Sequence, residues 1–463
     1  MTEAITGGEA AVTTYLDRRD LRRTILGASA GHLVEQYDSG LYAVTASLAF
    51  GTLFFTKLDA SAALVASFST YAVGFVARPL GGAVVSHFGD LRGRKNVFVA
   101  ILMVAGISTT LIGALPTATA IGIWAPILLV ILRFIQGLSL GAEYGGAALM
   151  VYENAPRRRR AFYTSFVPLA GALGIVIATV ALLGVAALPE QQMLSWGWRL
   201  PFLFAFVLVL IGVAIRMRLH EPVDFTEDVV HGQRAKVPFL EALRETPRQF
   251  LAIMIACVGL GAVYYLVVTW GMGYLTVTLG LPSRVGLIGL LISQVVYIAI
   301  IPFVGVAADK FGRRSLYMVG GLLISVYAFP FISMLNTRSA PIIWLAITAA
   351  MVIMSLLFTS ISTFICEQFP TKHRFSGAST SYTIGITIGG GFAPLIAASL
   401  VAATKQSWPI GLMIIIGGLL CAGGVLLVRD RLSADGGFQP DARSHVVDPR
   451  VSRAVRMKER AGE

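Results

Sequence analysis

Long apolar stretches separated by short polar loops run through most of this chain of 463 residues. Each stretch is about the 20 residues that an α-helix needs to cross the hydrocarbon core of a bilayer. Backbone groups in lipid must satisfy one another, which favours helices as the spanning element. Hydrophobic residues make up 56 % of the chain and charged residues only 13 %, whereas a soluble domain has about one quarter charged residues. The sequence therefore predicts an all-α membrane protein.

Twelve spans are predicted, and the longest internal polar segment, residues 220–248, separates the sixth span from the seventh. This spacing predicts two six-helix bundles, residues 22–219 and 249–428, joined by a cytoplasmic linker. Polar tails are expected at residues 1–21 and 429–463. The predicted spans are residues 22–50, 62–88, 96–116, 122–152, 162–186, 197–219, 249–279, 285–307, 315–335, 340–366, 376–402 and 407–428.

Basic residues gather on alternate loops, which predicts the orientation, because cytoplasmic loops of membrane proteins are enriched in Lys and Arg. Cations precede the first span and follow the second, fourth, sixth, eighth and tenth, whereas the other loops carry few. Both termini are therefore expected in the cytoplasm. This placement also accounts for the formal net charge of +12 without nucleic acid as a partner. The three cysteines show neither metal-ligand nor disulfide spacing, and neither a metal nor a cofactor is expected.

A short loop pattern occurs once in each half of the chain, at residues 86–95 and 305–314. Both copies contain an Asp, then a basic residue, then a Gly followed by two basic residues. Glycine permits a tight turn, and a repeated loop of this kind indicates two related membrane halves. The pattern resembles the loop signature of the major facilitator superfamily, which implies a cytoplasmic gating role for both copies. The corresponding gating residues are Asp90, Arg94, Asp309 and Arg313.

Ionisable side chains inside the predicted spans are the strongest functional signal, because each costs roughly 2.5–3.5 kcal/mol to insert. Glu35 and Asp38, in the first span, are neighbours on a helix. A rise of about 1.5 Å per residue places Arg78 of the second span at a depth similar to that of Glu35, so an ion pair is feasible. Two acids beside one Arg would leave one acid poorly compensated, and that carboxyl could carry a proton. The alternative is a static structural ion network.

The fourth span carries further charges. Arg133 is either a snorkelling cation or an anchor for a substrate carboxylate. Glu143 and Glu153 lie toward the cytoplasmic end and are assigned to the gate, Glu153 because it stands next to the basic run at residues 157–160. Small residues at every fourth position give this span a smooth face, for close packing or for sliding during transport. These small residues are Gly137, Gly141 and Gly145.

The second half has almost no charge in the middle of its spans and offers aromatic and polar side chains instead. This asymmetry suggests that the first half handles protons and charge while the second half supplies aromatic and hydroxyl contacts. The alternative is that these rings face lipid or pack in the core. The candidate substrate-binding residues of both halves are Arg78, Arg133, Tyr42, Gln136, Tyr265, Trp270, Gln294 and Tyr382.

Several sequence blocks, in order along the chain, resemble the metabolite:proton symporter family, and the resemblance runs from about residue 20 to residue 430. It implies an inner-membrane secondary transporter with a central cavity that couples proton entry to uptake of organic acids or zwitterionic osmolytes. Glu35, Asp38, Arg78 and Arg133 would line or adjoin the N-terminal wall of that cavity. The blocks are residues 35–38, 74–82, 136–146, 196–202, 367–371, 374–377 and 389–394.

The chain departs from the family pattern at several positions of the first half. Ser86 stands where the first loop signature normally begins with Gly, and Leu91 where a basic residue normally follows the Asp. These two changes put the tightness of the first-half gate in doubt. Gln36 and Ser39 replace the usual aromatic residues, which makes a cavity wall wider and more polar. The substrate is therefore expected to differ from those of better-known members.

The leading interpretation is proton-coupled uptake of a small organic acid, such as shikimate or a related carboxylate, by a monomer in the bacterial inner membrane. Glu35 or Asp38 would carry the proton. The alternative within transport is a proton symporter for a betaine-like osmolyte, with Tyr264, Tyr265 and Trp270 around the quaternary ammonium. A drug:proton antiporter and a non-transporting membrane sensor are disfavoured. No nucleophile–base constellation, phosphate loop or metal cluster is present in the sequence, so an enzyme is not expected.

Overall fold

A computed structural model describes residues 18–92, 94–141, 143–217, 243–370 and 374–428, without the side chains of residues 18–20, 83–98 and 216. Most or all of each predicted tail lies outside this part of the chain, and so does most of the predicted linker. The tails are residues 1–21 and 429–463, and the linker is residues 220–248. The boundaries of the two bundles therefore stay a prediction.

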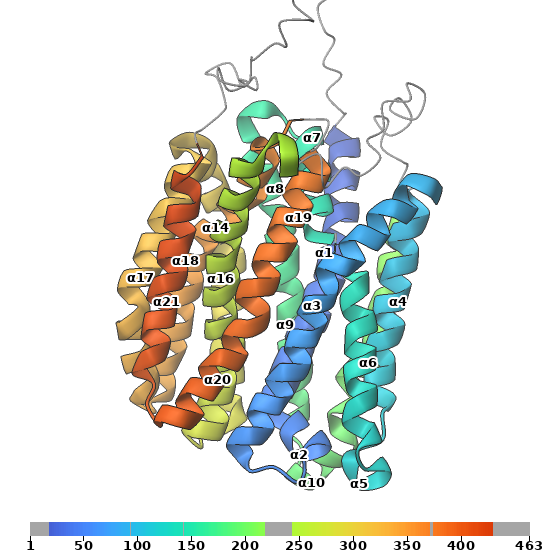
Figure 1. Cartoon of the computed structure of the whole chain (residues 1–463), viewed down its shortest axis with the longest axis vertical. Helices are drawn as coiled ribbons and strands as arrows, with labels where there is room; N and C mark the ends of the chain where they lie inside the picture. Colours follow the sequence, from blue (N-terminus) through green and yellow to red (C-terminus); the bar gives the residue numbers. More distant parts are fainter. Residues whose placement is uncertain (1–17, 93, 142, 218–242, 371–373, 429–463) are drawn as a thin grey trace, which may run out of the picture. The chain divides into compact units, whose positions relative to one another are not determined.

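The first half consists of helices that run roughly parallel or antiparallel to one another (Figure 1). Its first run is α1 (Arg18–Thr45), a π-helical turn η1 (Ala46–Phe50) and α2 (Gly51–Phe54). The remaining elements are α3 (Ala60–Arg92), α4 (Arg94–Ala114), α5 (Ala118–Ile121), α6 (Trp124–Ser139), α7 (Glu143–Asn154), η2 (Arg157–Arg159), α8 (Arg160–Thr164), α9 (Phe166–Val185), α10 (Glu190–Gln192), η3 (Met193–Gly197) and α11 (Arg199–Met217).

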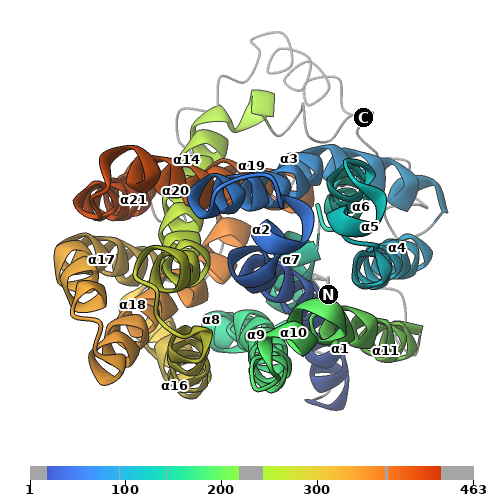
Figure 2. The same cartoon turned by 90° about the horizontal axis from the view of Figure 1, so that it is seen from below.

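The second half repeats this arrangement, with helices α14 to α21 on one side of the molecule and the first-half helices on the other (Figure 2). Two of its runs, Pro247–Thr278 and Arg374–Thr404, carry three π-helical turns between them, and such turns often mark functional places in helices. The elements are α14 (Pro247–Tyr265), η4 (Leu266–Trp270), α15 (Gly271–Gly273), η5 (Tyr274–Thr278), α16 (Ser283–Phe311), α17 (Arg313–Asn336), α18 (Ala340–Glu367), α19 (Arg374–Ile386), η7 (Thr387–Gly391), α20 (Phe392–Thr404) and α21 (Trp408–Leu426).

Among the described residues, nine helical runs are long and apolar enough to cross a bilayer, and a tenth is the bent pair Glu190–Gly197 and Arg199–Ile215. The shorter apolar helix Val99–Ala114 and the first run, with its buried charges, occupy the other two predicted positions. All twelve predicted spans therefore coincide with helical runs. Span four differs in detail, because it breaks between α6 and α7 near Gly141.

Small residues let α3 and α6 pack with their backbones almost in contact. A side chain at Gly137 would meet the carbonyl oxygen of Gly74, and one at Gly141 would meet the carbonyl oxygen of Arg78. These two glycines are thus used for packing inside the first half, as one of the two interpretations of the small-residue face predicted. Gly145 instead faces Ser379 of α19, in the other half.

Replacing Gly137 with Leu is expected to prevent α3 and α6 from packing, because its Cβ already lies inside contact distance of rigid backbone. We expect little monodisperse protein on size-exclusion chromatography in detergent and a loss of several kcal/mol of stability, about the cost of overpacking a core. The matched control is Gly423→Leu in α21, where a Cβ has no neighbour within 4 Å. Equal yields and thermal midpoints for the two variants would contradict this account of the packing.

Candidate functional site

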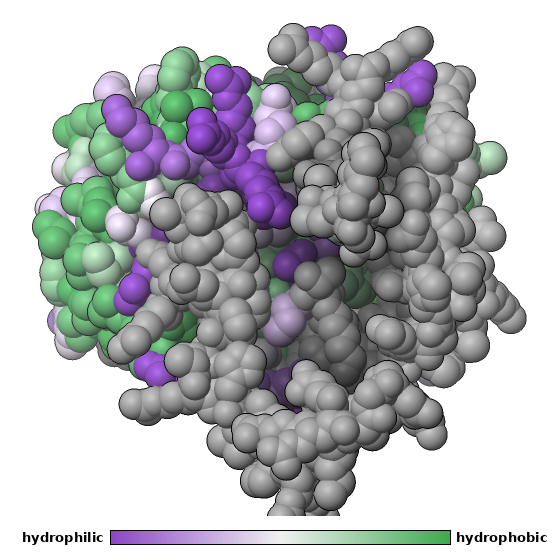
Figure 3. All heavy atoms as spheres, turned by 90° about the horizontal axis from the view of Figure 1, so that it is seen from above, coloured by the Kyte–Doolittle hydropathy of each residue, from purple (hydrophilic) through white to green (hydrophobic). Residues whose placement is uncertain are grey.

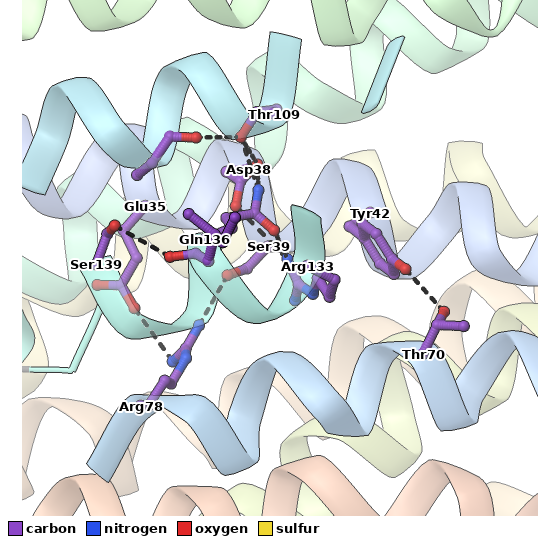
Figure 4. Close-up of polar contacts among 12 residues, drawn as sticks. Glu35, Asp38, Ser39, Tyr42, Thr70, Arg78, Thr109, Arg133, Gln136 and Ser139 are labelled. Atoms are coloured by element: carbon purple, nitrogen blue, oxygen red, sulfur yellow. Dashed lines mark hydrogen bonds and ion pairs between the residues drawn. The ribbon is translucent and has the colours of Figure 1, made fainter. Parts of the chain in front are cut away.

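The first of two buried ion pairs joins α1 to α3. Oε1 of Glu35 lies 3.2 Å from Nη1 of Arg78. This contact agrees with the ion pair that the similar depth of the two residues made feasible. The other oxygen, Oε2, lies 3.1 Å from Nδ1 of His32, one turn earlier on α1. Arg78 also donates from Nη2 to Ser39 Oγ at 3.1 Å (Figure 4). Arg78 is thus held between two side chains of α1.

The second pair joins α1 to α6 and lies beside the first (Figure 4). Asp38 Oδ2 is 3.7 Å from Nη1 of Arg133. Its other oxygen, Oδ1, accepts hydrogen bonds from Thr109 Oγ1 of α4, at 2.5 Å, and from Gln136 Nε2 of α6. Arg133 also donates to Oε1 of Gln136. Asp38 is therefore enclosed by three helices of the first half.

These two pairs correct the sequence-based account of the charges. Each acid has its own guanidinium partner, so the expectation that two acids share one Arg is wrong. Arg133 is 1 % exposed and therefore does not snorkel to the membrane surface. Its guanidinium lies 4.1 Å from the ring centre of Tyr42 and 5.0 Å from that of Tyr71, a cation–π arrangement. The sequence could not show these partners, because they depend on how the helices are rotated.

A shell of aromatic rings connects the ion pairs to the second half. Tyr265 of α14 makes edge contacts with Tyr71 and Phe75 of α3, at centroid distances of 5.9 and 5.2 Å. Phe75 in turn lies under the guanidinium of Arg78, 4.4 Å from ring centre to Cζ. The charges of the first half and the rings of the second half thus meet at the seam between the two halves.

A second chain of contacts crosses the seam through Tyr144 of α7. Its ring stacks on Tyr382 of α19, at a centroid distance of 4.2 Å and an angle of 14°. Its hydroxyl shares a hydrogen bond of 2.6 Å with Ser362 of α18. His32 packs its ring edge-on against the same tyrosine, with 5.0 Å between centroids. Glu35 therefore contacts the second half through His32 and Tyr144.

Two predicted substrate residues of the second half lie in other surroundings. Trp270 stacks on Tyr274, whose hydroxyl donates to Asn336 of α17 at 2.6 Å. Gln294 of α16 is buried, and its Nε2 has no hydrogen-bond partner among the described residues. Nε of Arg133 is likewise buried without a hydrogen-bond partner there.

Asp309, one of the gating residues, makes contacts across the seam at the end formed by α7 and α8, and Arg313 holds it from within the second half. Asp309 of α16 accepts hydrogen bonds from the backbone N–H groups of Ala161 and Phe162, at 3.0 and 2.9 Å, which caps the start of α8. Arg313 donates to Asp309 at 2.6 Å and lies 3.4 Å from Glu367.

The other predicted gating residues are described only in part. Glu153 lies 3.5 Å from Arg374 of α19, in the second half, and its gating role stays a prediction. Asp90 lies in α3 and Arg94 in α4, but their side chains are outside the part of the chain that the structure describes. Their gating role therefore stays a prediction. Glu143 is buried at the start of α7.

The two halves also touch at the opposite end. Ser47 of η1 donates to the carbonyl oxygen of Thr269 in η4 at 3.2 Å. Arg284 of α16 donates to the carbonyl oxygen of Ala186 at 3.2 Å. With seam contacts at both ends, this structure has the two halves closed on each other, and rings fill the seam between the ion pairs and the second half.

A small cavity of about 20 Å³ lies inside the first half, lined by residues of α1, α4, α6, α7 and α11. Glu35, Asp38, Thr109 and Glu143 are among its lining residues. A cavity of this size can hold a water molecule when polar groups surround it. Both acids of the ion pairs therefore border the same small cavity.

His32, Thr109 and Tyr144 are site residues that the sequence did not single out for a role. His32 could have been suggested by its position one turn before Glu35 on a helix. Thr109 carried no signal, because a Thr hydroxyl in an apolar helix usually hydrogen-bonds its own backbone, as Thr109 also does to Ala105. Tyr144 carried none either, because an aromatic ring in an apolar span usually packs in the core.

The chain matches the family model described as the Major Facilitator Superfamily over residues 28–374 and 285–458. It therefore belongs to this superfamily and is a multi-pass membrane transporter rather than an enzyme. Membership also confirms the predicted fold class of twelve transmembrane helices in two six-helix bundles.

Individual relatives refine this assignment. The shikimate transporter of Escherichia coli strain K12 is 38 % identical over 416 residues, which cover 88 % of this chain and 94 % of that protein. The proline/betaine transporter of the same strain is 31 % identical over 403 residues, 85 % of this chain and 80 % of that protein. These relatives confirm the predicted resemblance to the metabolite:proton symporter family.

Solved structures share the fold at lower sequence identity. The proton:xylose symporter XylE superposes with a TM-score of 0.69, over 89 % of this chain and 95 % of its own, at 17 % identity. This likeness shows the fold alone.

Proposed function

We propose that this protein is a proton-coupled symporter that imports a small organic acid of the shikimate type. The observation that carries the proposal is the buried pair of Glu35 and Arg78 at the seam between the halves. A buried ion pair is weak evidence for stability, because desolvation of the two charges offsets their attraction. Ionisable groups at membrane depth usually mark a transport path instead.

The pair couples proton and substrate by competition for one guanidinium. While Glu35 is ionised, it neutralises Arg78. A proton on Glu35 removes that charge and leaves Arg78 available to a substrate carboxylate, which Arg binds through two parallel hydrogen bonds. Proton binding and anion binding then favour each other, and linkage makes this effect reciprocal. Symport follows, because the loaded site carries both ligands.

The Asp38–Arg133 pair supplies a second proton site deeper in the first half. Asp38 borders the small cavity of the first half, apart from the seam. Nε of Arg133 and Nε2 of Gln294, both buried without a hydrogen-bond partner among the described residues, are donors for substrate oxygens. The walls of the site would be completed by Tyr42, Gln136, Tyr265 and Tyr382, whereas Trp270 would contribute from η4, beyond the end of α14.

Movement follows the alternating-access cycle of such transporters, in which one half rocks against the other around a central site. His32, Tyr144 and Tyr382 link Glu35 to the second half, so a change of charge on Glu35 alters a contact across the seam. The gate at the α7–α8 end is formed by Asp309, Arg313, Glu153 and Arg374. We assign this end to the cytoplasmic side of the bacterial inner membrane, and both termini to the same side. The working unit is a monomer.

A betaine-like zwitterion is the second candidate, since a proline/betaine transporter is among the relatives. A quaternary ammonium would need free aromatic faces. Of the rings expected around it, Trp270 stacks on Tyr274, and Tyr264 and Tyr265 contact each other edge-on. The rings beside the two arginines are covered by their guanidinium groups. This occupation of the aromatic faces favours a carboxylate without a permanent cation.

Uptake by the purified protein in proteoliposomes tests the proposal. With an inward proton gradient of about one pH unit, symport of one proton supports about tenfold accumulation of substrate. We expect radiolabelled shikimate or a related hydroxy acid to accumulate and a proton ionophore to abolish the effect, while glycine betaine stays at its equilibrium level. Gradient-driven accumulation of betaine, without accumulation of any acid, would assign the second candidate instead.

A further inference from the structure

A groove of about 340 Å³ opens at the α7–α8 end of the molecule, where the two halves meet. One wall comes from η2 and α8 of the first half, and the other from the last turns of α16 in the second half. Hydrophilic residues gather on this end, beside apolar surface (Figure 3). The groove is lined by Arg158, Arg159, Phe162, Val306, Asp309 and Lys310.

The charge of this groove is positive. Arg158, Arg159 and Lys310 are exposed, and no acidic partner pairs with any of them in the described part of the chain. The single acid in the lining, Asp309, is occupied by Arg313 and by the two backbone N–H groups at the start of α8. Three cations therefore face the groove without a counter-charge from the described residues.

The surface that continues from the groove along α16 is apolar. Val306 is 54 % exposed, Phe303 75 % and Phe311 64 %, values that suit only a lipid-facing helix in a membrane protein. Phe303 precedes Lys310 by two helical turns, about 10 Å along the axis. A ligand that satisfies both surfaces has an anionic head at the level of Lys310 and apolar chains at the level of Phe303.

We propose that this groove is a binding site for the headgroup of an anionic phospholipid. The phosphate contacts Arg158 and Arg159 from the first half and Lys310 from the second, and the acyl chains lie on Phe303 and Val306. A free phosphate or phosphorylated metabolite would use the cations but leave the apolar surface without a partner. The proposal does not rest on the identity of the transported substrate.

The position of the groove gives the lipid a regulatory effect. Its headgroup bridges the two halves beside Asp309, so the contact exists only while the halves meet at this end. A ligand shifts a conformational equilibrium toward the state that it binds better. Anionic lipid should therefore favour the state closed at the α7–α8 end and slow its opening.

The test compares the wild type with the triple variant Arg158→Gln, Arg159→Gln and Lys310→Gln. The matched control removes three exposed cations from the opposite end of the molecule. It is the triple variant Lys57→Gln, Arg338→Gln and Lys405→Gln. Binding of phosphatidylglycerol to the purified full chain in nonionic detergent is measured by native mass spectrometry and by the rise in thermal midpoint. Phosphatidylcholine and inorganic phosphate are the comparison ligands, and the midpoint without lipid reports on folding.

Phosphatidylglycerol is expected to bind the triple variant about a hundredfold more weakly than the wild type. The variant loses three cations, each of which contributes about 1 kcal/mol to binding an anionic headgroup. The control variant should bind like the wild type. In the wild type, the lipid should also slow hydrogen exchange of the Ala161 and Phe162 amides, which donate to Asp309. Equal affinity of all three proteins, or equal stabilisation by inorganic phosphate, would overturn the proposal, and neither result would bear on substrate or proton coupling.

Discussion

Gradient-driven accumulation of substrate is expected to disappear when Glu35 is replaced by Gln, and to fall in the same way when Asp38 is replaced by Asn. The amides keep the shape of the acids and can still accept hydrogen bonds, but they cannot take up a proton. Under a gradient of about one pH unit, the ratio of internal to external substrate should drop from about ten to about one. Exchange of internal for external substrate, which needs no net proton transfer, should persist.

The Asp38 variant needs a second form, because it leaves the buried charge of Arg133 without its partner, at a cost of about 3–5 kcal/mol. The double variant Asp38→Asn with Arg133→Gln removes both charges and is expected to recover thermal stability without recovering proton coupling. Uptake with and without an imposed gradient, and counterflow in the same proteoliposomes, separate coupling from folding. If folded Glu35 and Asp38 variants both accumulate substrate like the wild type, the proton assignment is wrong.

Loss of substrate binding is the expected result of replacing Arg78 with Gln. The guanidinium is the proposed anchor of the substrate carboxylate, and removing one partner of a buried charge pair costs about 2–5 kcal/mol, or at least about thirtyfold in affinity. Arg78→Lys should bind with intermediate affinity, because an ammonium restores the charge without the two-pronged geometry. Binding is measured by isothermal titration calorimetry with shikimate.

The control for this variant is Arg338→Gln, which removes an exposed arginine at the far end of α17. It should leave the dissociation constant unchanged. The pH dependence provides a further check. Because protonated Glu35 frees Arg78, the affinity of the wild type for shikimate should increase as the pH falls. In the Glu35→Gln variant, the part of this pH dependence that comes from Glu35 should be lost. Wild-type affinity in folded Arg78→Gln would rule out the guanidinium as the anchor.

The spans themselves were predictable, because each depends only on local composition. The tenth, predicted at residues 340–366, is observed as Ala340–Glu367, since a polar loop precedes it and a proline follows soon after. The break between α6 and α7 was not predicted. Gly141 could serve either a continuous helix or a turn, and its close contact with the backbone of α3 appears only once the two helices are packed.

The Glu35–Arg78 pair was predictable for a similar reason, because depth along two consecutive spans can be counted in residues. The partners of Asp38 were not, since Thr109 and Arg133 lie on helices whose rotation about their own axes is not encoded in any local pattern. The same holds for Glu153, whose contact with Arg374 of the second half depends on how the two halves pack.

The amino-acid sequence by itself thus determined that this chain crosses a membrane as twelve helices and holds charges at membrane depth, because hydropathy, helix length and the cost of burying charge are local properties. The tertiary structure alone decided that each acid has its own arginine, that His32 and Tyr144 connect Glu35 to the other half, and that three cations from different halves share one groove. Those facts depend on which faces of distant helices meet, and that is settled by packing over the whole bundle.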